Sequence, residues 1–441
     1  MTLCQIRFRI VFQRTFLKLF AETFVKINEI TNLFFKITSM ELISVTKKIS
    51  NAKAILSAEI NSASFKEKKT IFFSYPERFY DFLPVSADPF FPALLIPSMM
   101  SGENLIIHTA LSENIMQNQA VIQEVFKTWY PEKLNIIEVE PKSVNGFNNI
   151  QNGKNATFFS LGVDSMYTML KYLPANNPPK DKRLNYLLYM KGLELPLSHY
   201  SQGQDKLVIQ KVENLASHYG LDVIVGETNI RDVFSVDFET LYTGPCLASI
   251  ALSLSAGLKN IFIPSHYSYT SLFPVASSPL IDHLWSNEDT SIIHDGSEKD
   301  RAEKVTDQIV NDSFALDNLR VCVSNDGGDF NCGKCWKCIR TMITLDIVGK
   351  LGESAAFPDS LPKTYCKELK TWDYSSMVFV KENLKLARKY KKKKLERILK
   401  NEIRIGKFDQ IREGLPIYFI LREMIFYYMV KTGRKLKILG F

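Results

Sequence analysis

The segment ATFFSLGVDSMYTMLKY, residues 156–172, carries the pattern on which the predicted fold rests. Its start, 156–159, predicts a short apolar strand, and its end, 166–172, predicts a helix. The residues between them, 160–165, form a turn that contains one glycine. A helix that begins directly after such a turn points free backbone N–H groups and the positive end of its dipole toward the turn. The segment therefore predicts a phosphate-binding site.

Three side chains of this turn can take part in chemistry. Ser160 and Ser165 supply hydroxyl donors, and Asp164 supplies a carboxylate that could hold Mg²⁺ against phosphate oxygens. The turn lacks the Gly-Lys-Ser/Thr ending of a Walker loop, which excludes that class of phosphate site. The alternative interpretation is an ordinary strand-to-helix turn that is capped by Asp164 or Ser165.

The pattern Ser-x-Gly-x-Asp-Ser resembles the PP-loop signature Ser-Gly-Gly-x-Asp-Ser of the ATP pyrophosphatases. Those enzymes bind ATP with its pyrophosphate in the loop and transfer AMP to a substrate oxygen. The resemblance implies catalytic roles for Asp164 and Ser165, and nucleotide binding by Ser160, Leu161, Gly162, Val163, Asp164 and Ser165. Leu161 stands where the family usually has its first glycine. We therefore expect the loop to avoid backbone angles that only glycine tolerates.

The sequence after the turn has the period of an α/β sheet. Apolar strands are predicted at Leu184–Met190, Asp222–Gly226 and Asn260–Pro264, with helices at Gln204–Tyr219 and Pro245–Ala256. Together with the turn they predict a doubly wound parallel sheet over 155–350, similar to the adenine nucleotide alpha hydrolase fold. In such sheets ligands bind at the carboxyl ends of the strands, which nominates by position alone Lys191, Thr228, Asn229, Arg231, Ser265 and His266.

A loop that enters a helix at 294–304 supplies two further candidate catalytic residues. Arg301 and Lys304 lie three residues apart and share one helix face, so they could bind the phosphates of ATP. They could equally pair with Glu298 or Glu303 at the surface. Weaker candidates are acid–base groups or substrate contacts that could equally be structural: His266, His294, Asp282 and Trp285.

Four cysteines have the spacing of a metal site in the segment CVSNDGGDFNCGKCWKC, residues 322–338. Two successive Cys-x-x-Cys steps place three thiolates around one point, and the fourth returns across a Gly-Gly loop to complete a tetrahedron. We therefore expect an insertion that binds structural zinc through Cys322, Cys332, Cys335 and Cys338. An iron–sulfur cluster is the open alternative, whereas the lack of an export signal disfavours disulfides.

The turn and the cysteines together resemble the 7-cyano-7-deazaguanine synthase family over residues 156–349, and Arg340 fits the last position of its cysteine motif. That family uses ATP and ammonia to convert a deazapurine carboxylate into an amide and then a nitrile, through adenylated intermediates. The resemblance implies ATP, Mg²⁺ and Zn²⁺ as cofactors. Its members are generally short and have one domain, so the flanking regions of this chain depart from the pattern.

The flanks divide the 441-residue chain further. Residues 1–39 are a leader or extension, 40–144 an α+β domain, and 351–441 a basic helical region. The first flank carries six basic and two acidic residues and the stretch 381–441 carries eighteen and six, so the formal charge of +8 leaves −8 for 40–380. The acidic middle offers no broad surface for nucleic acid, but the basic tail could contact RNA or an acidic protein.

Three functions follow as expectations for a cytoplasmic protein without a membrane span. The first is ATP-dependent adenylation of a small substrate, followed by nitrogen transfer from ammonia. The second is sulfur transfer, as in PP-loop enzymes that thiolate tRNA, with Cys246 as its best sulfur carrier. We expect Cys246 instead to be a small buried residue. The third is a non-catalytic zinc module. The acceptor substrate and the oligomeric state are left open.

Overall fold

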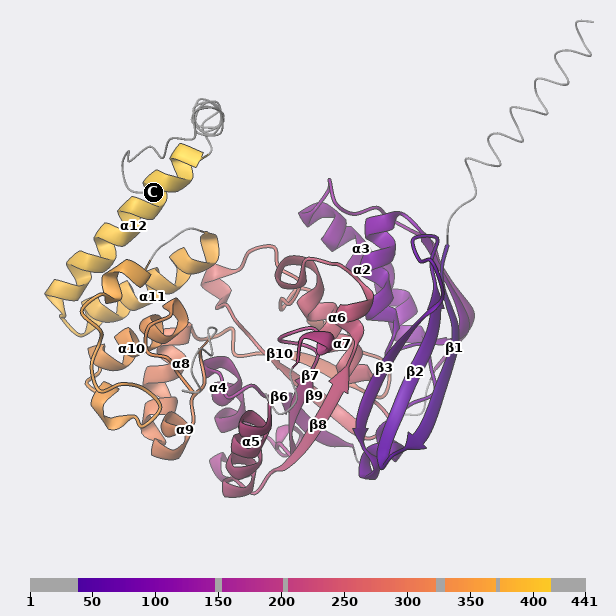
Figure 1. The fold of residues 1–441 in the computed structure, drawn as a ribbon, viewed down its shortest axis with the longest axis horizontal. Coiled ribbons are helices and arrows are strands. Elements are labelled where there is room, and N and C mark those ends of the chain that lie inside the picture. The colour runs from indigo at the N-terminus through magenta and orange to yellow at the C-terminus, as the bar shows by residue number, and fades with distance from the viewer. Residues whose placement is uncertain (1–38, 147–152, 201–204, 323–329, 370–372, 414–441) are drawn as a thin grey trace, which may run out of the picture.

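A computed structural model describes residues 39–146, 153–200, 205–322, 330–369 and 373–413. Its strands form one ten-stranded sheet in the order β10-β9-β6-β7-β8-β3-β2-β1-β4-β5. Figure 1 shows β6 to β10 in the middle of the molecule and β1, β2 and β3 at its right-hand side. The strands are β1 Ser39–Ser50, β2 Lys53–Asn61, β3 Lys69–Pro76, β4 Asn104–Ser112, β5 Val139–Asn145, β6 Lys154–Phe158, β7 Tyr186–Lys191, β8 Asp222–Thr228, β9 Leu258–Pro264 and β10 Ser291–Asp295.

The half of the sheet that contains the turn is parallel. Strands β6, β7 and β8 follow one another in one direction, whereas β9 and β10 continue on the other side of β6. The strand order therefore reverses at β6, as a doubly wound sheet requires. Strand β10 was absent from the sequence-based prediction, which treated His294 and Asp295 as part of a loop.

The sheet as a whole is mixed, so the prediction of a parallel sheet holds only for this half. Strand β3 pairs antiparallel with β8, and β1, β2 and β3 are antiparallel to one another. Parallel pairing resumes where β1 meets β4 and β4 meets β5. The β3 to β8 pairing joins the N-terminal strands to the parallel half without a break.

Helices cover both faces of the sheet, as the side chains of strand β7 show, since they are buried on both sides. Leu187 packs with α4 Val163–Tyr172 and α5 Lys206–His218. Its neighbour Leu188 belongs to a core on the opposite face. That core includes residues of α2 Phe91–Ser101, α3 Glu113–Trp129 and α7 Thr243–Leu252.

A group of helices lies beyond the sheet, next to α4 (Figure 1). Helices α8, α10 and α11 contact one another, and α8 also contacts α4. The remaining helix bounds are α6 Ile230–Val233, α8 Arg301–Asp307, α9 Ser313–Asp317, α10 Trp336–Ile347, α11 Tyr374–Lys389 and α12 Lys393–Glu413. This arrangement brings the C-terminal part of the chain against the predicted phosphate site.

The N-terminal half differs from the prediction in two respects. Strand β5 spans Val139–Asn145, so the domain boundary expected at residue 144 falls inside a strand. The hairpin of β1 and β2 was not predicted, although β2 alternates buried and partly buried residues along most of its length. Within the described parts of the chain, no helix combines the length and apolar character needed to cross a bilayer.

One side chain after the end of β8 adds hydrogen bonds to the pairing of β3 with β8, and this contact can be tested. Asn229 donates to the Thr70 carbonyl at 2.8 Å and accepts from the Phe72 N–H at 2.9 Å. Asn229→Ala leaves both backbone groups without this partner, so we expect the free energy of unfolding to fall by about 1–3 kcal/mol. Urea denaturation measures it, with the exposed Glu67→Ala as control. An equal, small effect of both variants would contradict this role.

Candidate functional site

The carboxyl ends of β6 and β9 define the place where a ligand is expected. These two parallel strands are neighbours, and the chain leaves them toward opposite faces of the sheet. The turn that was singled out in the sequence follows β6, and Ser265 follows β9. The turn therefore lies at the topological switch point of the parallel half.

The turn is closed by hydrogen bonds from its own serines. Ser165 Oγ donates to the Gly162 carbonyl at 3.0 Å and accepts from the Ser160 N–H at 3.3 Å. Gly162 is the N-cap residue of α4. Because glycine has no side chain, the N-cap residue makes no side-chain capping hydrogen bond to this helix. The first N–H groups of α4 therefore stay available to an anion in the turn.

Leu161 corrects the expectation about the backbone of the turn. Its φ is +64°, in the left-handed region that glycine usually occupies, although the sequence predicted that a side chain would prevent this. The Leu161 side chain is fully buried in the core beside α4, and its carbonyl accepts from the Arg320 N–H at 2.9 Å. These contacts offset a strain on the order of 1–3 kcal/mol. Only backbone atoms of Leu161 and of the buried Val163 can serve a ligand.

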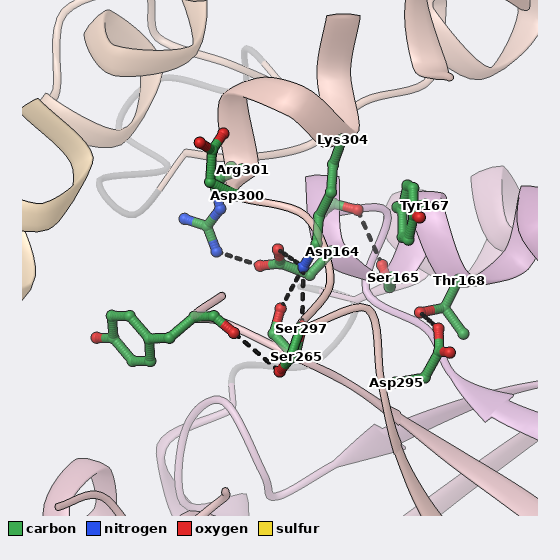
Figure 2. Close-up of polar contacts among 12 residues, drawn as sticks. Asp164, Ser165, Tyr167, Thr168, Ser265, Asp295, Ser297, Asp300, Arg301 and Lys304 are labelled. Carbon is green, nitrogen blue, oxygen red and sulfur yellow. Dashed lines mark hydrogen bonds and ion pairs between the residues drawn. The ribbon is translucent and has the colours of Figure 1, made fainter. Parts of the chain in front are cut away.

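Asp164 is the centre of a buried ion cluster, which Figure 2 shows. Arg301 Nη2 donates to Asp164 Oδ2, and Lys304 Nζ donates to Asp164 Oδ1 at 3.0 Å. Lys304 Nζ also donates to the carbonyl and the hydroxyl of Ser265, at 2.7 and 3.0 Å. Lys304 is 1% exposed and Asp164 7% exposed. The cluster thus joins α4, α8 and the end of β9.

The charges of this cluster set the ionisation of Asp164. Burial by itself raises the pKa of Asp164, but the positive charges of Arg301 and Lys304 outweigh burial and hold the pKa well below its usual range. Half-buried Lys337 adds another positive group, whose pKa is lowered by burial and by the charge of Arg301. Cations therefore outnumber carboxylates around Asp164, and the surroundings suit an anionic ligand.

The predicted shared face of Arg301 and Lys304 is present, because both side chains reach Asp164. Neither pairs with the two glutamates that sequence analysis offered as alternatives. Glu298 accepts from Lys171 and Tyr167, while Glu303 forms a capping box with Asp300 at the start of α8. The two basic residues therefore lie in the candidate site rather than in surface ion pairs.

The residues nominated by position at strand ends have different roles. Ser265 belongs to the cluster, and exposed His266 follows it. Arg231 instead donates to the carbonyls of Leu193 and Glu194, each at 2.7 Å. The other three stay outside the described ion cluster: half-buried Lys191, fully buried Thr228, and Asn229 at the β3 to β8 junction.

The proposed acid–base role of His294 and the proposed substrate contacts of Asp282 and Trp285 are not supported. His294 Nδ1 is hydrogen-bonded to Asp282 Oδ2 at 2.7 Å. Asp282 and Trp285 are each 0% exposed, and the Trp285 ring packs against Phe91 with the ring centroids 6.3 Å apart. These residues belong to the core under β10.

The four predicted cysteines come together. The Sγ atoms of Cys322, Cys332, Cys335 and Cys338 all lie within 4.8 Å of one another. Two of the Sγ to Sγ distances are 3.9 Å, from Cys332 to Cys338 and from Cys322 to Cys335. A tetrahedral ion with bonds to sulfur of about 2.3 Å separates its ligands by about 3.8 Å, so the thiols fit zinc. The Gly-Gly loop at 327–328 lies outside the described residues.

Buried Asn331, which the sequence did not single out, connects the two segments of the cysteine cluster. Its amide donates to the carbonyls of Leu319 and Ala356, and its carbonyl accepts from the Val321 N–H. Gly333 has a φ of +64°, and an added Cβ would lie 2.6 Å from Pro358. Arg320 links the cluster to the turn through its bond to the Leu161 carbonyl.

Helix α11 supplies site neighbours that no motif predicted. The Phe379 ring lies under two guanidinium groups, with its centroid 4.8 Å from Arg301 Cζ and 3.9 Å from Arg340 Cζ. Arg340, which sequence analysis noted only as a match to the family motif, is also 4.7 Å from the Trp336 ring. Glu382 lies 7% exposed among these groups. These contacts join residues far apart in the chain, so no local sequence signal could reveal them.

Comparison of the chain with protein-family models, with curated proteins and with solved structures found no match.

The cysteine cluster yields a second prediction. Cys335→Ser is expected to reduce bound zinc to well below one ion per chain and to lower thermal stability, because metal-binding energy is folding energy at such a site. Elemental analysis and thermal unfolding measure both effects, with Cys366→Ser as the control outside the cluster. Iron with a visible chromophore in the unaltered protein would contradict zinc and favour an iron–sulfur cluster.

The ionisation of Asp164 yields a third prediction. Because its pKa is lower in the folded protein, Asp164 stabilises the fold above about pH 4, and this stability is lost as the pH falls further. Asp164→Asn leaves two buried cations without their carboxylate and is expected to cost about 3 kcal/mol at pH 7. The difference from the unaltered protein should shrink between pH 5 and pH 3, as followed by urea denaturation. A difference that stays constant over this range would argue against it.

Proposed function

We propose that this protein activates a small substrate by ATP-dependent adenylation and then transfers nitrogen to it. The observation that carries this proposal is the turn after β6, which lies at the switch point of a parallel sheet with two buried cations directed at its aspartate. Fold, turn and cysteine cluster together support the PP-loop resemblance that the sequence suggested. The expected location of such an enzyme is the cytoplasm.

The turn would bind the pyrophosphate part of ATP. The backbone N–H groups at the start of α4 and the hydroxyl of Ser160 would donate to phosphate oxygens. The left-handed Leu161 supports this role, because it gives the turn the conformation expected at a position where the family has glycine. Ser165, whose hydroxyl closes the turn, would keep these donors in place.

Arg301 and Lys304 would stabilise the pyrophosphate as it leaves. Negative charge develops on the leaving group when the substrate oxygen attacks the α-phosphorus, and fixed cations in a buried site stabilise this charge most effectively. Lys304 is positioned for this task by two bonds to Ser265. The products of the step are the adenylated substrate and pyrophosphate.

Mg²⁺ would be held by Asp164 together with phosphate oxygens, since this ion usually combines one or two carboxylates with its substrate's phosphates. When bound it would neutralise phosphate charge. In the described structure Arg301 and Lys304 each contact one carboxylate oxygen of Asp164, so Mg²⁺ would compete with these two cations for Asp164.

The family resemblance suggests the acceptor. A carboxylate such as that of a deazapurine would attack ATP, and ammonia would then displace AMP from the acyl adenylate to give an amide. A second adenylation on the amide oxygen, followed by loss of AMP, would give the nitrile. Zinc in the cysteine cluster would have a structural role, fixing the start of α10 next to the turn.

Sulfur transfer is the second candidate function, and it depends on a reactive thiol. Cys246 is 0% exposed, as predicted, and burial raises the pKa of its thiol well above the usual range. A thiol that is neutral and shielded from solvent is a poor carrier of persulfide. This observation favours nitrogen over sulfur as the nucleophile.

The third candidate, a non-catalytic module that binds RNA or protein through its basic tail, has less support. Several basic side chains of the C-terminal helices pair within the chain: Lys385 with Asp300 and Glu303, and Arg388 and Lys400 with Glu396. Exposed lysines at 391–394 remain available to a partner. Residues 414–441 lie outside the described part of the chain.

Pyrophosphate exchange provides the fourth prediction. With an acceptor present, the protein is expected to incorporate labelled pyrophosphate into ATP, and Asp164→Ala and Lys304→Met are each expected to reduce this by about 100-fold or more. Candidate acceptors are a deazapurine carboxylate and fractions of a metabolite extract, and mass spectrometry of the product identifies the nucleophile.

Two variants serve as controls for this experiment. Lys299→Met removes a surface pair with Asp307 and should leave exchange unchanged. Cys246→Ser should keep both exchange and product formation. Exchange without product in Cys246→Ser would favour sulfur transfer, and full exchange by Asp164→Ala would refute the assigned site.

A further inference from the structure

A small cavity lies where α8, α10 and α11 meet, beside the Asp164 cluster. It is lined by Arg301, Ala302, Val305, Arg340, Thr341, Thr344, Phe379, Glu382 and Asn383. Charged side chains from all three helices therefore line one cavity, and the helix that contributes Glu382 belongs to the basic C-terminal region.

Several polar atoms of this cavity have no hydrogen-bond partner in the described structure. They are Arg301 Nε, the Nε and Nη1 atoms of Arg340, and Glu382 Oε1. Burial raises the pKa of Glu382 to about 8, and the charge of Asp300 acts in the same direction, whereas the charge of Arg301 opposes both. Buried polar atoms are nearly always paired in native proteins, so this set calls for an explanation.

Of the two cations on Asp164, Arg301 is held by fewer hydrogen bonds among the described residues. Lys304 is fixed by three polar contacts and is 1% exposed. Among the described residues, the side-chain hydrogen bond of Arg301 is with Asp164, and its guanidinium lies over the ring of Phe379. A guanidinium can slide over an aromatic ring without losing that contact. Glu382 lies three residues after Phe379 on α11, and it lines the same cavity as Arg301 and Phe379.

We propose that Glu382 is the second carboxylate partner of Arg301 and receives its guanidinium when Asp164 binds another cation. The movement pairs Arg301 with the unpartnered oxygen of Glu382 and frees Asp164 Oδ2. Glu382 is thus a positioning residue that acts through Arg301. The identity of that cation rests on the proposed function, in which Mg²⁺ binds Asp164 together with a nucleotide.

Helix α11 is held in the place that this exchange requires. Lys385 Nζ contacts Asp300 Oδ2 at 3.0 Å and Glu303 Oε1 at 2.5 Å, both at the start of α8. Asn383 donates to the Arg340 carbonyl at 3.1 Å, which ties α11 to α10. Helix α11, which carries Glu382, is therefore fixed against α8 and α10, while Asp164 stands on α4, which contacts α8.

A double-mutant cycle without any ligand tests whether Asp164 and Glu382 compete for the guanidinium of Arg301. In the unaltered protein Glu382→Gln replaces an unpartnered buried carboxyl group by an amide, so the midpoint of thermal unfolding should stay the same or rise. In Asp164→Asn, Arg301 should already have turned to Glu382. Adding Glu382→Gln should then lower the midpoint by about 3 °C or more.

Lys385→Gln is the matched control, because it weakens the docking of the same helix without removing a partner of Arg301. Its shift should be equal in the two backgrounds. Equal shifts for Glu382→Gln in the two backgrounds would refute the proposal, since they would show that Asp164 and Glu382 do not compete for one group.

A second measurement covers the case in which Asp164→Asn does not fold. Calorimetry with Mg²⁺ and pyrophosphate as probes is expected to show about tenfold weaker binding to Glu382→Gln and unchanged binding to Lys385→Gln. Equal binding by both variants and the unaltered protein would overturn the role of Glu382. Absence of binding to the unaltered protein would instead overturn the proposed function, while the unfolding cycle would still decide whether Arg301 is shared.

Discussion

The pairing of Asp164 with Arg301 and Lys304 is the interaction on which the rest of the site depends. A buried carboxylate is costly unless cations compensate its charge, and here the two cations come from a helix more than a hundred residues away in sequence. The pairing fixes α8 against α4 and, through Lys304, against the end of β9. The turn, its aspartate and the cations therefore form one unit.

Two other parts of the chain support this unit. The cysteine cluster holds the segment before α10. In this segment the backbone N–H of Arg320 donates to the Leu161 carbonyl and fixes the backbone of the turn. Helix α11 places Phe379 under Arg301 and Arg340. The C-terminal region is therefore part of the surroundings of the site, although its composition indicated only a basic helical extension.

The N-terminal half contributes to the same structure through the sheet. Because β3 pairs with β8, the core on one face runs from Met40 to Ile292 without interruption. Strand ends of the parallel half are thus supported by residues that the sequence placed in a separate α+β domain. The boundaries of that division remain a prediction, whereas the continuity of the sheet is a feature of the described structure.

The sequence by itself determined those features that depend on local order. The strand and helix around the turn followed from apolar periodicity, and the metal-like cluster followed from cysteine spacing, because both signals lie within a few residues of one another. The common face of Arg301 and Lys304 followed from helical geometry alone. Buried Cys246 followed from the apolar residues around it.

The remaining features could not be predicted from the sequence, because they depend on packing between distant segments. The left-handed backbone of Leu161 is tolerated since its side chain fills the core and Arg320 bonds its carbonyl, neither of which the turn encodes. Strand β10 was hidden because its charged end resembles a loop. The partnership of Arg301 with Asp164, and its position beside Glu382, arises because long-range contacts bring α4, α8 and α11 together. Charge pairing across such distances leaves no periodic signal in a sequence.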